Sequence, residues 1–132
     1  MTNDYAIADY GDFEIHVKRA GVGSRAYSNK IAELELKYRR KDEMIKNGFI
    51  SDEGAKKLDA AKRVDYAKLA AEHIVVRWKG SVKGEELKKF SKEGAVELLS
   101  GEGNEALFID VLQVATDENN FQVELDEQEV KN

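Results

Sequence analysis

The chain has 132 residues, a length typical of one domain. Charged side chains make up 36% of it, against about 25% in an average domain, and the net charge is −5. With no cysteine and two histidines, the sequence excludes disulfides and thiolate sites and argues against a histidine metal cluster. No apolar run approaches the roughly 20 residues of a membrane span, and the acidic, polar N-terminus is unlike a secretory signal. We therefore expect a soluble, cytoplasmic protein.

The charge is unevenly distributed along the chain. Residues 102–132 contain nine acidic side chains and one basic side chain, a net charge of −8, so residues 1–101 carry +3. An acidic C-terminal third opposes nucleic-acid binding there, because nucleic acid is a polyanion, and it suits either solubility or a basic protein partner. Since residues 126–132 are polar and terminal, we expect one domain over residues 1–125 followed by a flexible acidic tail.

Alternation of apolar and charged residues predicts a β-hairpin near the N-terminus. Within residues 12–19, Phe13, Ile15 and Val17 alternate with polar and charged residues, which is the pattern of a half-buried strand. Residues 5–7 alternate in the same way, and Gly11 can turn the chain between the two strands. His16 falls on the polar face of the second strand, where we expect a surface residue rather than a ligand or base.

A first helix is predicted to begin at Ser24 or Ser28, either of which could cap it, and to run to about Asn47. Its apolar residues recur at helical spacing and define one face: Tyr27, Ile31, Leu34, Tyr38 and Ile45. Gly48 is a natural helix stop. The rest of the helix carries a short basic cluster, which consists of Lys37, Arg39, Arg40 and Lys41. This cluster is either a solvated helix face or a contact for phosphate or an acidic partner.

A long second helix is predicted from Ser51, a good N-cap, to about Trp78. Its apolar stripe follows spacings of three and four: Ala60, Val64, Ala67, Ala71, Ile74 and Trp78. Small residues in the stripe let a neighbouring helix approach closely, and the stripe must be covered by the first helix or by another subunit. His73 lies beside the stripe, where we interpret it as a packing residue.

Two shorter helices are predicted after an exposed, charged loop at residues 79–90. Ser91 begins the first, which ends at the glycines of residues 101–103, and Asn104 begins the second. Residues 117–125 fit either a strand or a further helix. These elements together predict a mainly α fold, which is a compact helical domain of about four helices with a small N-terminal β-hairpin. The complete absence of proline agrees with a mainly helical chain.

The sequence contains no recognisable catalytic motif. Residues 21–24 are similar to the start of a phosphate-binding loop but lack the full glycine pattern and a βαβ unit, so they predict a turn. Pairs of adjacent carboxylates, such as Glu85 and Glu86, have no histidine or apolar segment beside them. Their spacing is also not that of metal ligands. We therefore expect no enzyme activity and no cofactor or metal, and a protein that acts by binding.

Four segments, in this order, resemble the tail assembly chaperones of long-tailed bacteriophages. They are the strand at residues 13–20, the helix end at residues 71–80 with its Trp-x-Gly motif, the aromatic-Ser helix start at residues 90–99, and the last helix with its aromatic ending at residues 107–121. The chain departs from the family pattern in two places. Gly94 stands where asparagine is common, and Lys89 stands where proline is usual.

The resemblance implies a non-catalytic morphogenetic protein of a phage or prophage. Such chaperones bind the long, helical tape measure protein, keep it soluble and help tail tube subunits polymerise around it. The expected partners are therefore the tape measure protein, the tail tube protein and further copies of the chain, with no membrane or nucleic acid. The expected location is the host bacterial cytoplasm, and the chain is expected to be absent from the mature virion.

Two kinds of candidate residue follow. Trp78 and Phe90 are expected to be structural anchors between the long helix and the next one, and Tyr27, Tyr38 and Leu58 are candidates for partner binding. Two other functions stay open. One is another phage structural part, such as a head–tail connector or tail completion protein, and the other is a small regulatory or nucleic-acid-binding protein that uses the basic cluster of the first helix.

Overall fold

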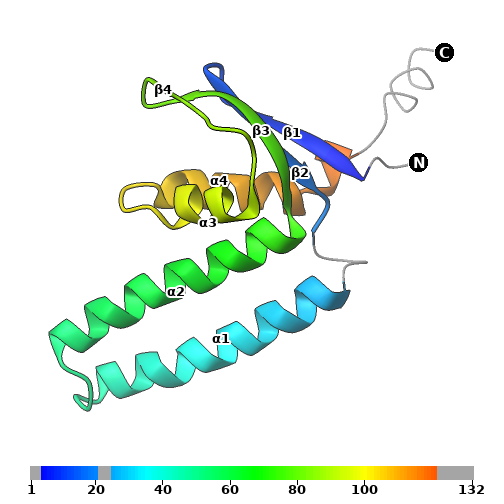
Figure 1. Ribbon diagram of the computed structural model, residues 1–132. Coiled ribbons are helices and arrows are strands. Elements are labelled where there is room, and N and C mark those ends of the chain that lie inside the picture. The colour runs from blue at the N-terminus through cyan, green and yellow to red at the C-terminus, as the bar shows by residue number, and fades with distance from the viewer. Residues whose placement is uncertain (1–3, 21–24, 122–132) are drawn as a thin grey trace.

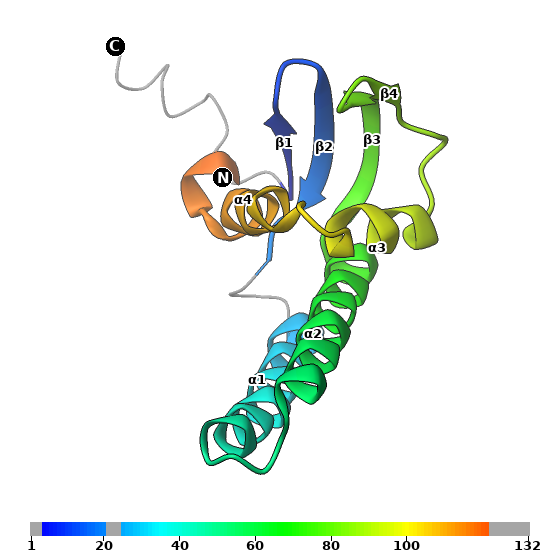
Figure 2. The ribbon, with the colours of Figure 1, turned by 90° about the vertical axis from the view of Figure 1, so that its left-hand side faces the viewer.

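The computed structural model describes residues 4–20 and 25–121. Its elements in chain order are β1 (Tyr5–Asp9), β2 (Phe13–Lys18), α1 (Arg25–Lys46), α2 (Asp52–His73), β3 (Val75–Val82), β4 (Glu85–Glu86), α3 (Lys92–Ser100), α4 (Glu105–Thr116) and the 3-10 turn η1 (Glu118–Phe121). Figure 1 shows that α1 and α2 run side by side as a two-helix arm, here defined as residues 25–73. The other described elements form the body, from which the arm projects (Figure 2).

The body is built on a four-stranded antiparallel sheet in the order β1-β2-β3-β4. β2 is central, because Ile15 lies opposite Ala8 of β1 on one side and Trp78 of β3 on the other. Ile15 and Val17 are buried, and α4 packs against β1 and β2. Helix α2 packs against both α1 and α3, so it connects the arm to the body.

The predicted fold is right in its helices and wrong in the extent of its sheet. Four helices and the N-terminal hairpin are present among the described residues, but the hairpin is only half of a larger sheet, so the fold is mixed α/β and mostly helical. The predicted end of the second helix at about Trp78 was wrong, because α2 ends at His73 and Trp78 lies in β3. Residues 74–76 are β-branched, which favours a strand wherever a partner strand is available.

The predicted loop at residues 79–90 also contains regular structure. The end of β3 turns back into the short strand β4 through Lys83 and Gly84, whose φ angles are 54° and 81°. Two successive positive φ angles are the signature of the type I′ turn that joins antiparallel strands tightly. The loop interpretation therefore holds only for the residues that follow β4.

The predicted helix starts are confirmed at the two serines. Ser51 Oγ accepts a hydrogen bond of 3.1 Å from the Gly54 amide, and Ser91 Oγ accepts one of 2.9 Å from the Gly94 amide. Asn104 does precede α4, but its side chain does not cap that helix. Instead, its Nδ2 donates to the Leu98 carbonyl and its Oδ1 accepts from Lys83 Nζ, so it ties the α3–α4 loop to the β3–β4 turn.

The hydrophobic core lies mainly in the body. Its largest fully buried side chains come from β2, the α2–β3 junction, α4 and η1: Phe121, Ile15, Ile74, Val17 and Val111. Phe121 lies in the segment for which the sequence fits either a strand or a helix, and in the structure it belongs to the 3-10 turn η1. Residues 122–125 and the predicted tail at residues 126–132 lie outside the described residues. None of the described helices is both long and apolar enough to cross a bilayer.

Candidate functional site

A narrow seam of buried side chains holds the two helices of the arm together. Tyr27 and Tyr38 are the buried residues of α1. The Tyr38 hydroxyl donates a hydrogen bond of 2.5 Å to Oδ2 of Asp65 on α2, and Nζ of Lys37 lies 3.1 Å from the same oxygen. The hydrogen bond from Tyr38 and the lysine keep the pKa of Asp65 below its ordinary value, while burial and the Asp65 carboxylate raise the pKa of Tyr38 to about 12. At neutral pH, Asp65 therefore joins the helices as an ionised acceptor.

Three lysines surround the aromatic ring of Tyr38. Their Nζ atoms lie 5.2 Å (Lys37), 5.9 Å (Lys41) and 5.9 Å (Lys62) from the ring centroid, within the range of cation–π attraction. The ring of Tyr38 at the seam is thus flanked by cations from both helices.

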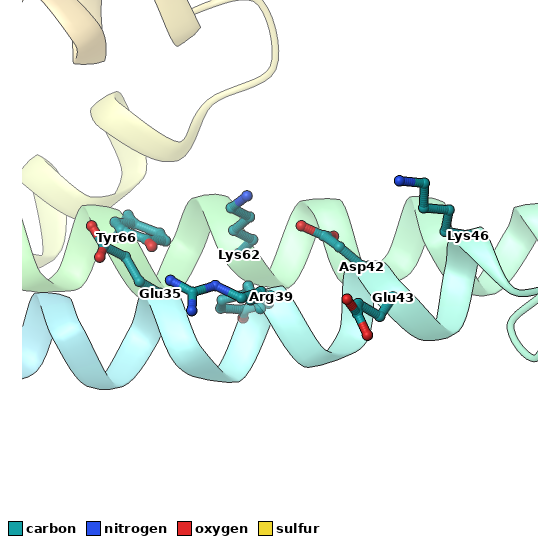
Figure 3. A pocket seen from close by; sticks show the side chains of 8 residues that line it. Glu35, Arg39, Asp42, Glu43, Lys46, Lys62 and Tyr66 are labelled. Atoms are coloured by element: carbon teal, nitrogen blue, oxygen red, sulfur yellow. The ribbon is translucent and has the colours of Figure 1, made fainter.

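A groove of about 410 Å³ follows the seam, as Figure 3 shows. Side chains of both helices line it: Glu35, Tyr38, Arg39, Asp42, Glu43, Lys46, Lys62 and Tyr66. We call it the mixed groove, because its three acidic and three basic side chains give it no net charge. Burial raises the pKa of Tyr66, and Glu35 and Asp42 add to that rise. Such a lining suits polar contacts, and it brings no nucleophile and base together.

The arm also exposes large apolar side chains. Phe49, in the turn between the helices, is 79% exposed, and Leu36 and Met44 of α1 are 47% and 41% exposed. A shallow hollow of about 410 Å³ on α1 is lined by these last two residues together with Glu33, Lys37, Arg40 and Lys41. Single exposed apolar residues are normal on protein surfaces, so these three are candidate contact residues of the arm.

The predicted partner-binding residues lie at the seam. Tyr27 and Tyr38 are buried, and the Tyr27 ring packs edge-on to His73 at 6.3 Å between centroids. Leu58 is half-buried and lines a small pocket beside Tyr38. Tyr27 and Tyr38 therefore contact α2 in this structure. The role of all three residues in partner binding stays a prediction. Leu36, Met44 and Phe49 were not predicted as contact residues, although the first two are apolar residues that lie outside the inner face of α1.

Trp78 and Phe90, the predicted anchors, are brought together. Their rings meet edge to face at 5.1 Å between centroids, and Trp78 Nε1 donates a hydrogen bond of 2.7 Å to the Lys88 carbonyl. The Trp78 ring also lies 3.3 Å from where a Cβ would stand at Gly94 of α3. Trp78 therefore contacts α3 from a strand of the sheet and not from the long helix. It also forms one wall of a cleft of about 510 Å³ between the β3–β4 turn and α3.

Gly80 gives the Trp-x-Gly motif a structural reason. It lies opposite Phe13 in the β2–β3 ladder with a φ of +106°. A Cβ at this position would stand 2.3 Å from the Asp12 carbonyl oxygen and 2.5 Å from the Phe13 Cα. Real Cβ atoms do not approach backbone this closely, so only glycine fits between the strands.

The titratable side chains on the sheet are joined by hydrogen bonds and by an ion pair of 3.3 Å between Lys79 Nζ and Glu14 Oε1. His16, predicted as a surface residue, is half-buried, with Nε2 3.0 Å from Glu14 Oε1 and Nδ1 accepting from Nε of Arg77 at 3.2 Å. The hydrogen bond from His16 and the nearby Lys79 lower the pKa of Glu14. Over residues 4–20 and 25–121, no three histidine, aspartate or glutamate side chains are grouped so that they could hold a metal ion.

Comparison with known proteins identifies the family. A family model described as the YdaY prophage protein matches residues 22–132, which include the arm, β3, β4 and the C-terminal helices. No curated protein and no solved structure matches the chain. The match supports the phage origin that the sequence resemblance implied, and it leaves the more specific chaperone assignment as a proposal. The chain belongs to the YdaY prophage protein family.

Proposed function

We propose that this prophage protein is a tail assembly chaperone. In this role it binds the tape measure protein through the arm, keeps it soluble and promotes polymerisation of the tail tube around it, without catalysis or a cofactor. It works in the host bacterial cytoplasm as a homo-oligomer and is not retained in the mature virion.

The observation that carries this proposal is the projecting arm with its exposed apolar side chains. Because the arm extends beyond the body, a long partner can lie along α1 without meeting the sheet (Figures 1 and 2). Leu36, Met44 and Phe49 are open on it, and a helical client can place its apolar face against such residues. Fully burying one such side chain contributes about 1.5–3 kcal/mol, so covering these partly exposed residues supplies a useful share of a binding energy.

The segments that carry the resemblance also meet in space, which supports the proposal. Gly80 of the Trp-x-Gly motif packs against Phe13 of β2, and Trp78 of the same motif packs against Phe90 before α3. The similar segments therefore belong to one structural unit, although they are far apart in the sequence.

Co-expression with the tape measure protein encoded by the same prophage tests the proposal. We expect that large protein to move from the pellet to the soluble fraction and to elute with this chain. A variant combining Leu36→Ser, Met44→Ser and Phe49→Ser should lose this effect. The matched control combines Ile7→Ser and Ile109→Ser, which change residues of the body that are each 54% exposed. A tape measure protein that stays insoluble with the native chain, or equal loss in the variant and the control, would contradict the proposal.

The alternative function is a structural part that stays in the particle, such as a head–tail connector or tail completion protein. Membership of a prophage family suits this role as well. Finding the chain in purified virions at a fixed ratio to the tail tube protein would favour the alternative over the chaperone.

A further inference from the structure

We propose that α1 recognises an acidic amphipathic helix of the client. The contact surface, here called the basic hollow, is the one lined by Glu33, Leu36, Lys37, Arg40, Lys41 and Met44. This inference rests on the proposed chaperone function and specifies the chemistry of the client segment. That segment is a helix with an apolar stripe flanked by aspartate or glutamate.

The spacing of the apolar residues fits a helical partner. Leu36 and Met44 are eight residues apart on α1, which corresponds to about 12 Å along a helix axis. Arg40 lies midway between them in the same hollow. A partner helix that runs along α1 can therefore place apolar residues two turns apart against Leu36 and Met44. Its acidic residues then fall beside the cations.

The charge of the basic hollow selects acidic partners. Its three cations outnumber its single carboxylate, Glu33. Lys37 and Lys41 are already drawn toward the Tyr38 ring, and Lys37 is paired with Asp65. Arg40 is exposed, and its side chain makes no hydrogen bond or ion pair with another described residue. Its guanidinium is thus the group best able to form a bidentate contact with a client carboxylate.

The charge of the whole chain favours an acidic helix over nucleic acid as the partner. The arm has twelve lysine and arginine residues and nine acidic residues, a net charge of +3. The remaining residues have nine basic and seventeen acidic side chains, a net charge of −8. A long polyanion is repelled by this second part, whereas one short acidic helix needs only the arm.

Binding of overlapping peptides that cover the tape measure protein tests this inference. Fluorescence anisotropy with the full chain should show that the bound peptides are those with acidic residues beside an apolar helical stripe, and that affinity falls as salt rises. The double variant Arg40→Glu with Lys41→Glu should weaken binding by about tenfold or more. The matched control, Arg39→Glu with Lys46→Glu, makes the same charge change in the mixed groove and should leave binding unchanged.

The outcomes separate this inference from the proposed function. If the native chain solubilises the tape measure protein but bound peptides show no acidic preference and the Arg40 and Lys41 variant binds normally, the inference is wrong and the chaperone function stands. If the native chain neither solubilises that protein nor binds any peptide, both are wrong. Duplex DNA that binds as tightly as the best peptide, and is lost in the same variant, would overturn the inference in favour of a nucleic-acid partner.

Discussion

Replacement of Gly80 by alanine should open the contact between β2 and β3. Gly80 has a φ of +106°, and an added Cβ would stand 2.3 Å from the Asp12 carbonyl oxygen and 2.5 Å from the Phe13 Cα. Both neighbours are backbone atoms, so no side-chain rotation relieves the overlap. The strands must move apart where the Ser81 amide donates a hydrogen bond of 2.9 Å to the same Asp12 oxygen.

The expected cost follows from these contacts. Holding alanine in this region of backbone conformation costs about 1–3 kcal/mol. Weakening the hydrogen bond to Asp12 adds about 1 kcal/mol, and displacing Phe13, which packs against the core, adds a similar amount. The variant should therefore lose about 3–5 kcal/mol of its free energy of unfolding, a large share of the roughly 5–15 kcal/mol of an ordinary domain.

Urea unfolding measures this loss, with the fluorescence of Trp78, the single tryptophan, as the probe. Gly84→Ala is the matched control in the neighbouring turn. Gly84 also has a positive φ, 81°, but no atom lies within 4 Å of an added Cβ, so only about 1 kcal/mol should be lost. Equal losses in the two variants would refute the steric explanation of the Trp-x-Gly motif.

Three further predictions concern the arm and the anchor. Tyr38→Phe removes the donor to Asp65 and should cost about 1–2 kcal/mol at neutral pH in urea unfolding. Since the folded state raises the pKa of Tyr38 to about 12 from an ordinary value near 10, the native chain should lose more stability than this variant as the pH rises from 10 to 12. Equal pH dependence would exclude the tyrosine as the cause. Trp78→Ala breaks the hydrogen bond to Lys88 and should cost about 3 kcal/mol, and an unchanged melting temperature would show that it is no anchor. Phe49→Ser should change stability by less than about 0.5 kcal/mol in thermal melting, because the side chain is 79% exposed, and a larger loss would mean that this residue is packed.

The helices could be predicted because their signals are local. Ser51 and Ser91 cap helices through side-chain bonds to residues three positions later, and Gly48 ends α1 with a positive φ. The third and fourth strands could not be predicted in the same way. β3 pairs with β2, and the opposed residues His16 and Arg77 are 61 positions apart, so no local pattern marks the pairing.

The end of α2 shows two signals in competition. Ile74 and Trp78 continue the helical spacing of the apolar stripe, which led the prediction past the true end at His73. The β-branched run at residues 74–76 was the competing signal for a strand. Pairing with β2 makes the chain continue as a strand from Val75. Here tertiary pairing overrides periodicity, and a single sequence does not display the partner.

The candidate site was predicted only in part. The apolar face with Tyr27 and Tyr38 was identified correctly as a helical face, but α2 covers it, so these tyrosines hold the arm together. The exposed apolar residues Leu36 and Met44 lie outside the apolar face that the helical spacing of α1 defines. Which face of a helix stays exposed depends on the neighbouring helix, and that information is not local.

Contact between the arm and the tape measure protein can be tested most directly by photo-crosslinking. A photoreactive amino acid is placed at Leu36 of the arm or, in a separate variant, at Ile109 of the body, and each chain is co-expressed with the tape measure protein of the same prophage. Both positions are exposed, so both can react with a bound protein. We expect a crosslink to the tape measure protein from Leu36 and none from Ile109. A crosslink from Ile109 alone, or from neither position, would contradict binding through the arm.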